Sequence, residues 1–278
     1  MSDRVTVSVE NGVADVKLSR PDKMNALDQA MFRALVETGR ALGADHAVRV
    51  VVLSGEGRAF CAGLDFASFM AMRSDDNGGG DASGRGSNGS ADLLSRRGDG
   101  PANFAQSAAW IWASIPQPVV AAVHGVAFGG GLQIALGADI RIVTPDARLS
   151  VMEIKWGLVP DMSATQTLRN LVRLDVAKEL TFTGRIVSGT EAVELGLATR
   201  TSDDPRAAAL ELAREIAQKS PHAIRAGKRL LNEAWVGSPA EGLALEEALQ
   251  RTLIGSPNQI EAVAANLEKR APRFSDAG

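Results

Sequence analysis

The sequence predicts an α/β core followed by a region of helices alone. Short apolar runs rich in β-branched residues alternate with helical patterns up to about residue 205, as in parallel sheets covered on both faces. After that point the chain carries amphipathic helical patterns without strand signals. Hydrophobic residues make up 45% of the 278 residues, enough to form a sizeable core. We therefore expect a core over residues 1–205 and a helical region over 206–278.

The N-terminal elements are predicted from turn and spacing signals. Two alternating apolar runs, 5–9 and 12–18, flank an Asn-Gly pair, which is typical of a tight hairpin turn. Residues 26–42 carry apolar side chains at helical spacing, with Asp28 in the expected first turn. Residues 49–53 read RVVVL, a strand buried on both faces. The order of elements is thus β-β-α-β.

Residues 74–100 differ in composition from the segments around them. Glycine, serine and charged residues dominate, and almost nothing there can be buried. Because strand and helix signals resume on both sides, we expect a flexible loop within the core rather than a linker between domains. A lid over a site and an inert insertion are equally consistent with this loop.

The remaining elements follow the same rhythm and then change to helices. A short helix is expected from Thr190, as its N-cap, to Gly196, as its C-terminal stop. The other predicted strands are 119–123, 139–143 and 148–152, and the other predicted helices are 132–137, 175–180, 206–219, 221–234 and 239–255.

Composition excludes several classes of function. A formal net charge of −3 argues against nucleic acid as the main ligand. The single cysteine, Cys61, can form no intrachain disulfide, and the three histidines lack the spacing of metal ligands. The sequence shows neither a signal peptide nor an apolar run long enough to span a bilayer. We therefore expect a cytoplasmic protein without metal or membrane insertion.

Three consecutive glycines, Gly129 to Gly131, follow a predicted buried strand and precede a helix. Glycines allow a ligand to approach backbone N–H groups without a Cβ in the way, and such amides suit an oxygen that becomes anionic. Close packing of strand against helix is the alternative explanation. Gln133 follows within one turn, so its side chain is expected to point into the same pocket.

A second segment offers the same chemistry. Residues 55–66 follow another buried strand and include the small residues Cys61, Ala62 and Gly63. Two strand ends with free amides can direct two N–H groups at one oxygen, which defines an oxyanion hole. A thioester carbonyl that becomes an enolate is a natural ligand for it. A G-x-G within 55–66 lacks the third glycine of a dinucleotide site.

Two acidic residues stand out from the 33 in the chain. Glu153 follows a predicted strand and Asp161 follows Pro160, and both have apolar neighbours where a solvated face is not expected. Burial would raise the pKa of each carboxyl toward the range useful for proton transfer. Other systems have less support: the sequence has no G-x-S-x-G elbow, Cys61 has no histidine nearby, and His124 is interpreted as a packing residue.

Five segments together resemble the crotonase superfamily, which includes the enoyl-CoA hydratases and isomerases. They occur in the order and at the spacing of that family, and the resemblance covers roughly residues 5 to 270. They are LSRPDKMNALD (18–28), FCAGLDF (60–66), VHGVAFGGGLQIALGADIRI (123–142), MEIKWGLVPDMSATQTL (152–168) and LTFTGRIVSGTEAVELGLATR (180–200).

The resemblance implies a spiral of ββα turns, a C-terminal helical trimerisation region and assembly as a homotrimer or a dimer of trimers. It implies an acyl-CoA substrate and no cofactor beyond that thioester. The family's oxyanion donors match the amides of Ala62 and Gly130. The coenzyme A contacts match Ala62, Gly63, Leu64, Asp65 and Gly130, with Lys23 and Arg20 as candidates for the phosphates.

The catalytic acids depart from the family's two-glutamate hydratase pattern. One glutamate matches Glu153, but Gln133 occupies the position of the other, and an amide orients water without taking its proton. Asp161 matches a working aspartate of the dienoyl-CoA isomerases. The expected catalytic set is thus Glu153, Asp161 and Gln133, which favours double-bond isomerisation slightly over hydration. Two alternatives stay open: an aroyl-CoA dehalogenase with Asp161 as nucleophile, and an acyl-CoA-binding protein without catalysis.

Overall fold

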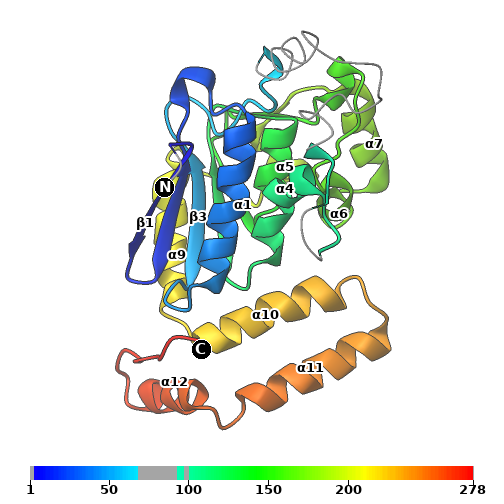
Figure 1. Ribbon diagram of the computed structural model, residues 1–278. Helices are drawn as coiled ribbons and strands as arrows, with labels where there is room; N and C mark the ends of the chain where they lie inside the picture. Colours follow the sequence, from blue (N-terminus) through cyan, green and yellow to red (C-terminus); the bar gives the residue numbers. More distant parts are fainter. Residues whose placement is uncertain (1–2, 68–92, 97–99, 278) are drawn as a thin grey trace, which may run out of the picture.

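The computed structural model describes residues 3–67, 93–96 and 100–277. The predicted loop at 74–100 therefore lies almost entirely outside the described residues. Two sheets and a set of covering helices form the core, and the remaining helices lie at one end (Figure 1). The strands are β1 (Val5–Glu10), β2 (Val13–Leu18), β3 (Val50–Gly55), β4 (Val119–Val123), β5 (Val126–Phe128), β6 (Ile140–Val143), β7 (Arg148–Ser150), β8 (Val187–Ser188) and β9 (Arg200–Thr201).

The larger sheet has six strands in the order β1-β2-β3-β4-β6-β9. Only the β1–β2 pair is antiparallel, joined by the predicted Asn11-Gly12 turn, where both residues adopt positive φ. From β2 onward every pair is parallel, so each connection crosses over the sheet. β3 and β4 are buried along almost their whole length, as their continuous apolar runs predict.

The smaller sheet, β5-β7-β8, lies beside the first and carries the site. β5 pairs in parallel with β7, and an isolated parallel bridge joins Cys61 to Ala127 within β5. The segment after β3 therefore meets the end of β5. These are the two strand ends that the glycine-rich motifs predicted to come together.

Helices cover both faces of the larger sheet. α1 (Gln29–Ala44), α4 (Phe104–Ser114) and α5 (Gly130–Leu136) share one large buried cluster with it, and α6 (Ala164–Leu168), α7 (Leu174–Thr183) and α8 (Gly189–Leu195) extend that layer. α9 (Pro205–Ala217) covers the other face through Ala209, Ala213 and Ala217. α9 thus belongs structurally to the core, although the expected boundary at residue 205 assigned it to the helical region.

The last three helices extend away from the core (Figure 1). α10 (Pro221–Ala234) and α11 (Pro239–Leu253) pack against each other, and α12 (Pro257–Leu267) leads into a C-terminal segment that returns to the core. Each of the three begins with proline after a serine N-cap, a strong local start signal.

Several local expectations differ from the structure. Helix α8 begins at Gly189 with Ser188 as its N-cap, so Thr190 lies inside the helix, while Gly196 ends it in the left-handed region as predicted. Asp28 is the N-cap of α1 rather than a first-turn residue. Helices α4 and α12 were not predicted. Within the described residues, no helix has the length and apolar composition to cross a membrane.

Candidate active site

The three consecutive glycines each meet a different requirement. Gly129 has a φ of +51°, and a Cβ built on it would lie 3.2 Å from a carboxylate oxygen of Glu153. A Cβ on Gly130 would lie 2.7 Å from the sulfur of Met162. A Cβ on Gly131 would overlap the carbonyl oxygen of Cys61 and lie 2.8 Å from its Cβ. Close packing therefore accounts for Gly131, whereas Gly129 and Gly130 border the acids' side of the site.

The 61–65 segment runs directly beside these glycines. Phe128 donates its backbone N–H to Cys61 O over 3.1 Å. A Cβ on Gly63 would lie 2.6 Å from Phe128 O and 3.8 Å from the amide nitrogen of Gly130. Such a residue cannot be anything larger than glycine without moving backbone, since Gly63 also has a φ of +88°. The two motifs are thus in contact.

The amide that we expected at Ala62 already has an acceptor. Ala62 donates its N–H to Met24 O over 2.9 Å, so it is not available to a ligand. Leu64 lies between Gly63, whose carbonyl accepts from Leu27, and Asp65, whose amide donates to Leu27. Among the described residues, the amides of Leu64 and Gly130 donate to no protein acceptor. The free donor of this segment is therefore Leu64, two residues beyond the expected one.

Glu153 is buried at the base of the site. It begins a short 3-10 helix, Glu153–Trp156, and is 8% exposed. Burial raises the pKa of its carboxyl and the negative charge of Asp161 raises it further, while hydrogen bonds from its own backbone and from Gln133 lower it. Its Oε2 is buried without a hydrogen-bond partner in the described structure. The prediction of a buried acid at this position is confirmed.

Asp161 differs from the expectation of burial. Its residue surface is exposed, because it lies in the irregular segment between the 3-10 helix and α6. Desolvation nevertheless raises the pKa of its carboxyl, and its charge acts on Glu153. The structure therefore brings the two predicted acids into the same electrostatic environment, with Glu153 inside and Asp161 at the surface.

Gln133 is also buried, at 2% exposure, and its side chain has three protein partners. Its Nε2 donates to Oε1 of Glu153 over 2.6 Å. Its Oε1 accepts the backbone N–H groups of Met162 at 2.7 Å and Ala164 at 3.1 Å. The side chain points toward Glu153, as the spacing predicted, but it is held by protein atoms.

Of the charged residues expected to contact coenzyme A, Asp65 and Arg20 form ion pairs within the protein, whereas Lys23 is exposed to solvent. Asp65 forms an ion pair with Arg20 at 2.8 Å, and Arg20 also donates to Ala26 O and lies 3.6 Å from Asp28. Arg20 therefore has its charge compensated within the protein. Lys23 ends a 3-10 turn (Pro21–Lys23) and is exposed. Lys23 is thus the more accessible of the two candidate phosphate contacts.

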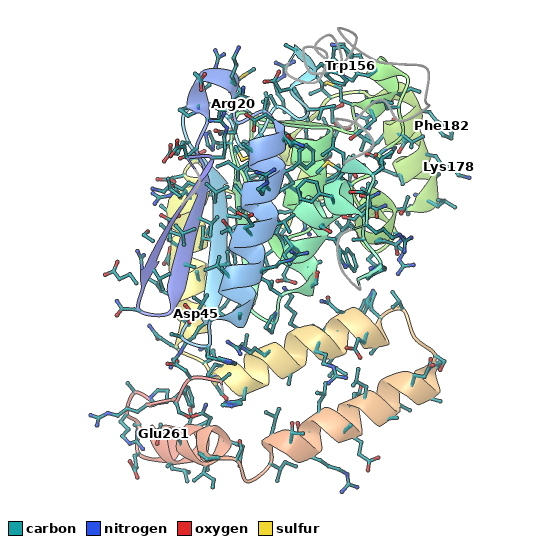
Figure 2. All side chains as sticks on the ribbon, in the orientation of Figure 1. Arg20, Asp45, Trp156, Lys178, Phe182 and Glu261 are labelled. Atoms are coloured by element: carbon teal, nitrogen blue, oxygen red, sulfur yellow. The ribbon has the colours of Figure 1, made fainter. Side chains whose placement is uncertain are left out.

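An aromatic pair connects the segment after Gly63 with the 3-10 helix that begins at Glu153. The rings of Phe66 and Trp156 lie 4.1 Å apart between centroids, tilted by 30°. Trp156 is 51% exposed and lies at the end of the molecule opposite α10–α12 (Figure 2). Its ring partner, Phe66, lies 90 residues away along the chain, so the sequence carries no local signal for this contact.

Other chemistries find no support in the described part of the chain. Cys61 is fully buried, its thiol contacts Asn25 O, and burial raises its pKa to about 12. His124 contacts Gly57 O, in agreement with a packing role. Residues 3–67, 93–96 and 100–277 contain no cluster of three His, Cys, Asp or Glu side chains that could bind a metal.

Comparisons with known proteins identify the family of the chain. The enoyl-CoA hydratase/isomerase family model matches residues 13–273. The human enoyl-CoA hydratase domain-containing protein 2, mitochondrial, is 33% identical over 98% of this chain and 88% of its own length. The mouse methylglutaconyl-CoA hydratase, mitochondrial, is 30% identical over 95% of this chain and 79% of its own. Because both relatives are named as mitochondrial proteins, a cytoplasmic location of this protein stays a prediction.

Solved structures show the same fold. A putative enoyl-CoA hydratase from Streptomyces coelicolor superposes with a TM-score of 0.86 at 31% identity, covering 99% of this chain and 95% of that one. An enoyl-CoA hydratase from Bacillus anthracis gives 0.85 at 28% identity, covering 98% of each chain. The predicted crotonase-type α/β spiral is confirmed. The chain belongs to the enoyl-CoA hydratase/isomerase family, within the crotonase superfamily.

Proposed function

We propose that this protein shifts the double bond of an unsaturated acyl-CoA through a thioester enolate. The observation that carries the proposal is the buried carboxyl of Glu153 near the amides of Leu64 and Gly130: within the described part of the chain, one carboxylate oxygen and both amides have no protein partner. Two such donors stabilise a developing oxyanion, and each is expected to contribute about 10²–10³ in rate. Both acids have raised pKa values, which suits proton transfer.

The proposed reaction needs one base and one acid. One of the two carboxyls, Glu153 or Asp161, removes a proton from the α carbon, and the resulting enolate oxygen is held by the amides of Leu64 and Gly130. The other carboxyl gives a proton to the γ or a more distant carbon. The double bond moves, and the atoms of the substrate are conserved. No cofactor beyond the coenzyme A thioester is required by this scheme.

Hydration is the second candidate function, favoured by the names of the similar proteins. The mouse relative and the Bacillus anthracis structure are called hydratases, and the human relative is named for an enoyl-CoA hydratase domain. In this chain Gln133 replaces one acid, so Glu153 would have to activate the water alone or with Asp161. The three hydrogen bonds of Gln133 to protein atoms make isomerisation the better supported of the two.

The experiment compares three substrates by ultraviolet absorbance. Purified protein receives crotonyl-CoA, a 3-enoyl-CoA and a 3,5-dienoyl-CoA. Formation of a conjugated product from the second or third supports isomerisation, whereas loss of the crotonyl absorbance supports hydration. Binding of the ester without turnover would identify a non-catalytic acyl-CoA-binding protein, and halide release from a haloaroyl-CoA would identify Asp161 as a nucleophile. Either of the last two results would overturn the proposal.

We also propose that the chain assembles as a homotrimer or a dimer of trimers. Large apolar side chains are exposed on α10 to α12 and on the turns beside them. A soluble monomer seldom exposes this much apolar surface in one region. These residues are Leu231, Trp235, Val236, Leu243, Ile254, Ile260, Val263 and Leu267.

A further inference from the structure

The side chain of Gln133 connects two parts of the site that are far apart in sequence. Through Nε2 it binds Glu153, 20 residues along the chain, and through Oε1 it binds the backbone at Met162 and Ala164, 29 and 31 residues along. Both acceptor positions of its carbonyl are therefore used, and one N–H of the amide is left. At 2% exposure, the residue does not reach bulk water.

The bond to Glu153 determines which carboxylate oxygen is available. Oε1 of Glu153 accepts from Gln133 at 2.6 Å, whereas Oε2 is buried without a partner in the described structure. A buried carboxylate oxygen without a hydrogen bond is energetically costly, which is typical of a group reserved for a ligand. The same carboxyl lies against Gly129, next to the free amide of Gly130.

The bonds to Met162 and Ala164 fix the segment that carries Asp161. Between these two residues, Ser163 adopts a left-handed φ of +73°, and its buried hydroxyl has no hydrogen-bond partner among the described residues. A non-glycine residue in this conformation is strained and persists only where its surroundings impose it. The two hydrogen bonds to Gln133 flank Ser163 and supply that constraint.

We propose that Gln133 is a positioning residue that locks Glu153 and the Asp161 segment together, leaving Oε2 as the one oxygen of the Glu153 carboxyl that exchanges a proton with the substrate. This inference rests on the function proposed above. It assigns Gln133 a role different from the expected orientation of substrate or water, since its contacts are to protein atoms.

Glutamine suits this role better than glutamate because it is neutral. A glutamate here could keep the bonds to Met162 and Ala164, but its second oxygen would face Oε1 of Glu153 at the distance now occupied by Nε2. Two carboxylates in such contact cannot both be ionised and must share a proton. With glutamine, Glu153 can ionise independently, and Asp161 is the charged group that acts on it.

The test titrates Glu153 directly, with no need for turnover. Glutamate labelled with ¹³C at the side-chain carboxyl is incorporated, and the Glu153 signal is assigned by its loss in Glu153→Gln. Gln133→Met removes all three bonds, so the apparent pKa of Glu153 should move upward. Gln133→Glu retains the backbone bonds and should give two coupled titrations, also with an upward shift. Because the second variant keeps the segment in place, it covers the case in which the first does not fold.

The matched control is Gln117→Met. Gln117 is fully buried and donates to Leu42 O and Asp45 O, away from the site. It should lower thermal stability and leave the titration of Glu153 unchanged. In turnover, Gln133→Met should lower kcat about tenfold with little change in KM, the scale of one lost charge-assisted hydrogen bond.

The outcomes separate this inference from the proposed function. If Glu153 titrates in Gln133→Met and Gln133→Glu as it does in the unmodified protein, Gln133 does not position it and the inference is overturned. If the unmodified protein turns over none of the acyl-CoA substrates while these variants shift the titration, the proposed reaction fails and the positioning role stands.

Discussion

The core and the three C-terminal helices differ in how they use apolar residues. In the core, the large side chains of Trp112, Phe32 and Phe60 are each less than 2% exposed. In the C-terminal region, α10 buries only Pro221 and α11 only Gly242, while Trp235 at the end of α10 and Leu243 within α11 are mostly exposed. One chain therefore forms a fully buried interior in the core, although Val159, Leu174 and Phe182 at its surface are mostly exposed, whereas α10 and α11 bury almost nothing.

Polar contacts show the same division. α10 is attached to the core by the buried Lys228, which pairs with Asp139 at 2.8 Å and donates to the carbonyl groups of Trp112 and Gln117. The C-terminal segment is attached through Arg49, which binds Asp276 and Phe274 O. A few directional bonds thus orient the helices, whereas apolar packing forms the site. Changes in one region should therefore leave the other intact.

The largest effect is expected for Glu153→Gln. The variant keeps the size of the side chain and an acceptor for Gln133 but removes the proton-transferring group. We expect kcat to fall by about 10²–10⁴, as for the loss of a general acid or base. Steady-state rates with the best of the three substrates measure this, and sedimentation should give an unchanged mass. A variant with near-normal rates would remove Glu153 from the mechanism.

The next largest effect should appear in the C-terminal region. Trp235→Glu places a charge on the exposed apolar surface of the turn after α10. If that surface is an interface, the change should weaken self-association by about 2 kcal/mol or more, as for an interface anchor. Sedimentation velocity over a range of concentrations measures it. An assembly unaffected by Trp235→Glu would show that the exposed apolar residues serve another purpose.

Two glycine-to-alanine changes compare the regions directly. Gly131→Ala places a Cβ against the backbone of Cys61, so we expect destabilisation by about 1–3 kcal/mol and reduced activity. Gly227→Ala in α10 meets nothing within 4 Å and should stabilise the helix by up to about 1 kcal/mol. Denaturant unfolding distinguishes them. Equal effects would mean that the site does not depend on close packing at Gly131.

The smallest effect concerns stability and pH. Burial raises the pKa of Glu153, so the native state holds this proton more tightly than the unfolded chain does. Stability should therefore fall as pH rises from the ordinary glutamate pKa through the raised one. Glu153→Gln removes this contribution. The free energy of unfolding of the variant minus that of the unmodified protein should therefore increase as pH rises. Urea unfolding at several pH values checks the sign.

Local signals in the sequence were sufficient to predict the elements whose ends are marked by turn-forming or capping residues. The Asn11-Gly12 hairpin and the stop at Gly196 are confirmed because turn chemistry acts over a few residues. Helix α4 was missed although Asn103 and Gln106 form a capping box before it. Its buried residues lie on one face, but Trp110, Ile111 and Ala113 place apolar side chains outside that face, so the alternation of apolar and polar residues is weak.

The sequence predicts which residues form the site, but not which hydrogen bonds they make. Spacing indicated that two glycine-rich segments meet and that Glu153 is buried, and both hold. Which amide stays free depends on Met24, whose carbonyl takes the N–H of Ala62 and leaves that of Leu64. The partners of Gln133 likewise come from distant segments. Such pairings arise from tertiary packing, which neither residue type nor local periodicity encodes.

The burial of Cys61 has a practical consequence for following the molecule in solution. Its thiol is fully buried and donates a hydrogen bond to Asn25 O, and burial raises its pKa to about 12. Thiol reagents attack the ionised form, so this sulfur should remain unlabelled in the folded state. Since the chain has no second cysteine, a cysteine introduced at the surface would take up a fluorescent or spin label alone, with the native sulfur left in place.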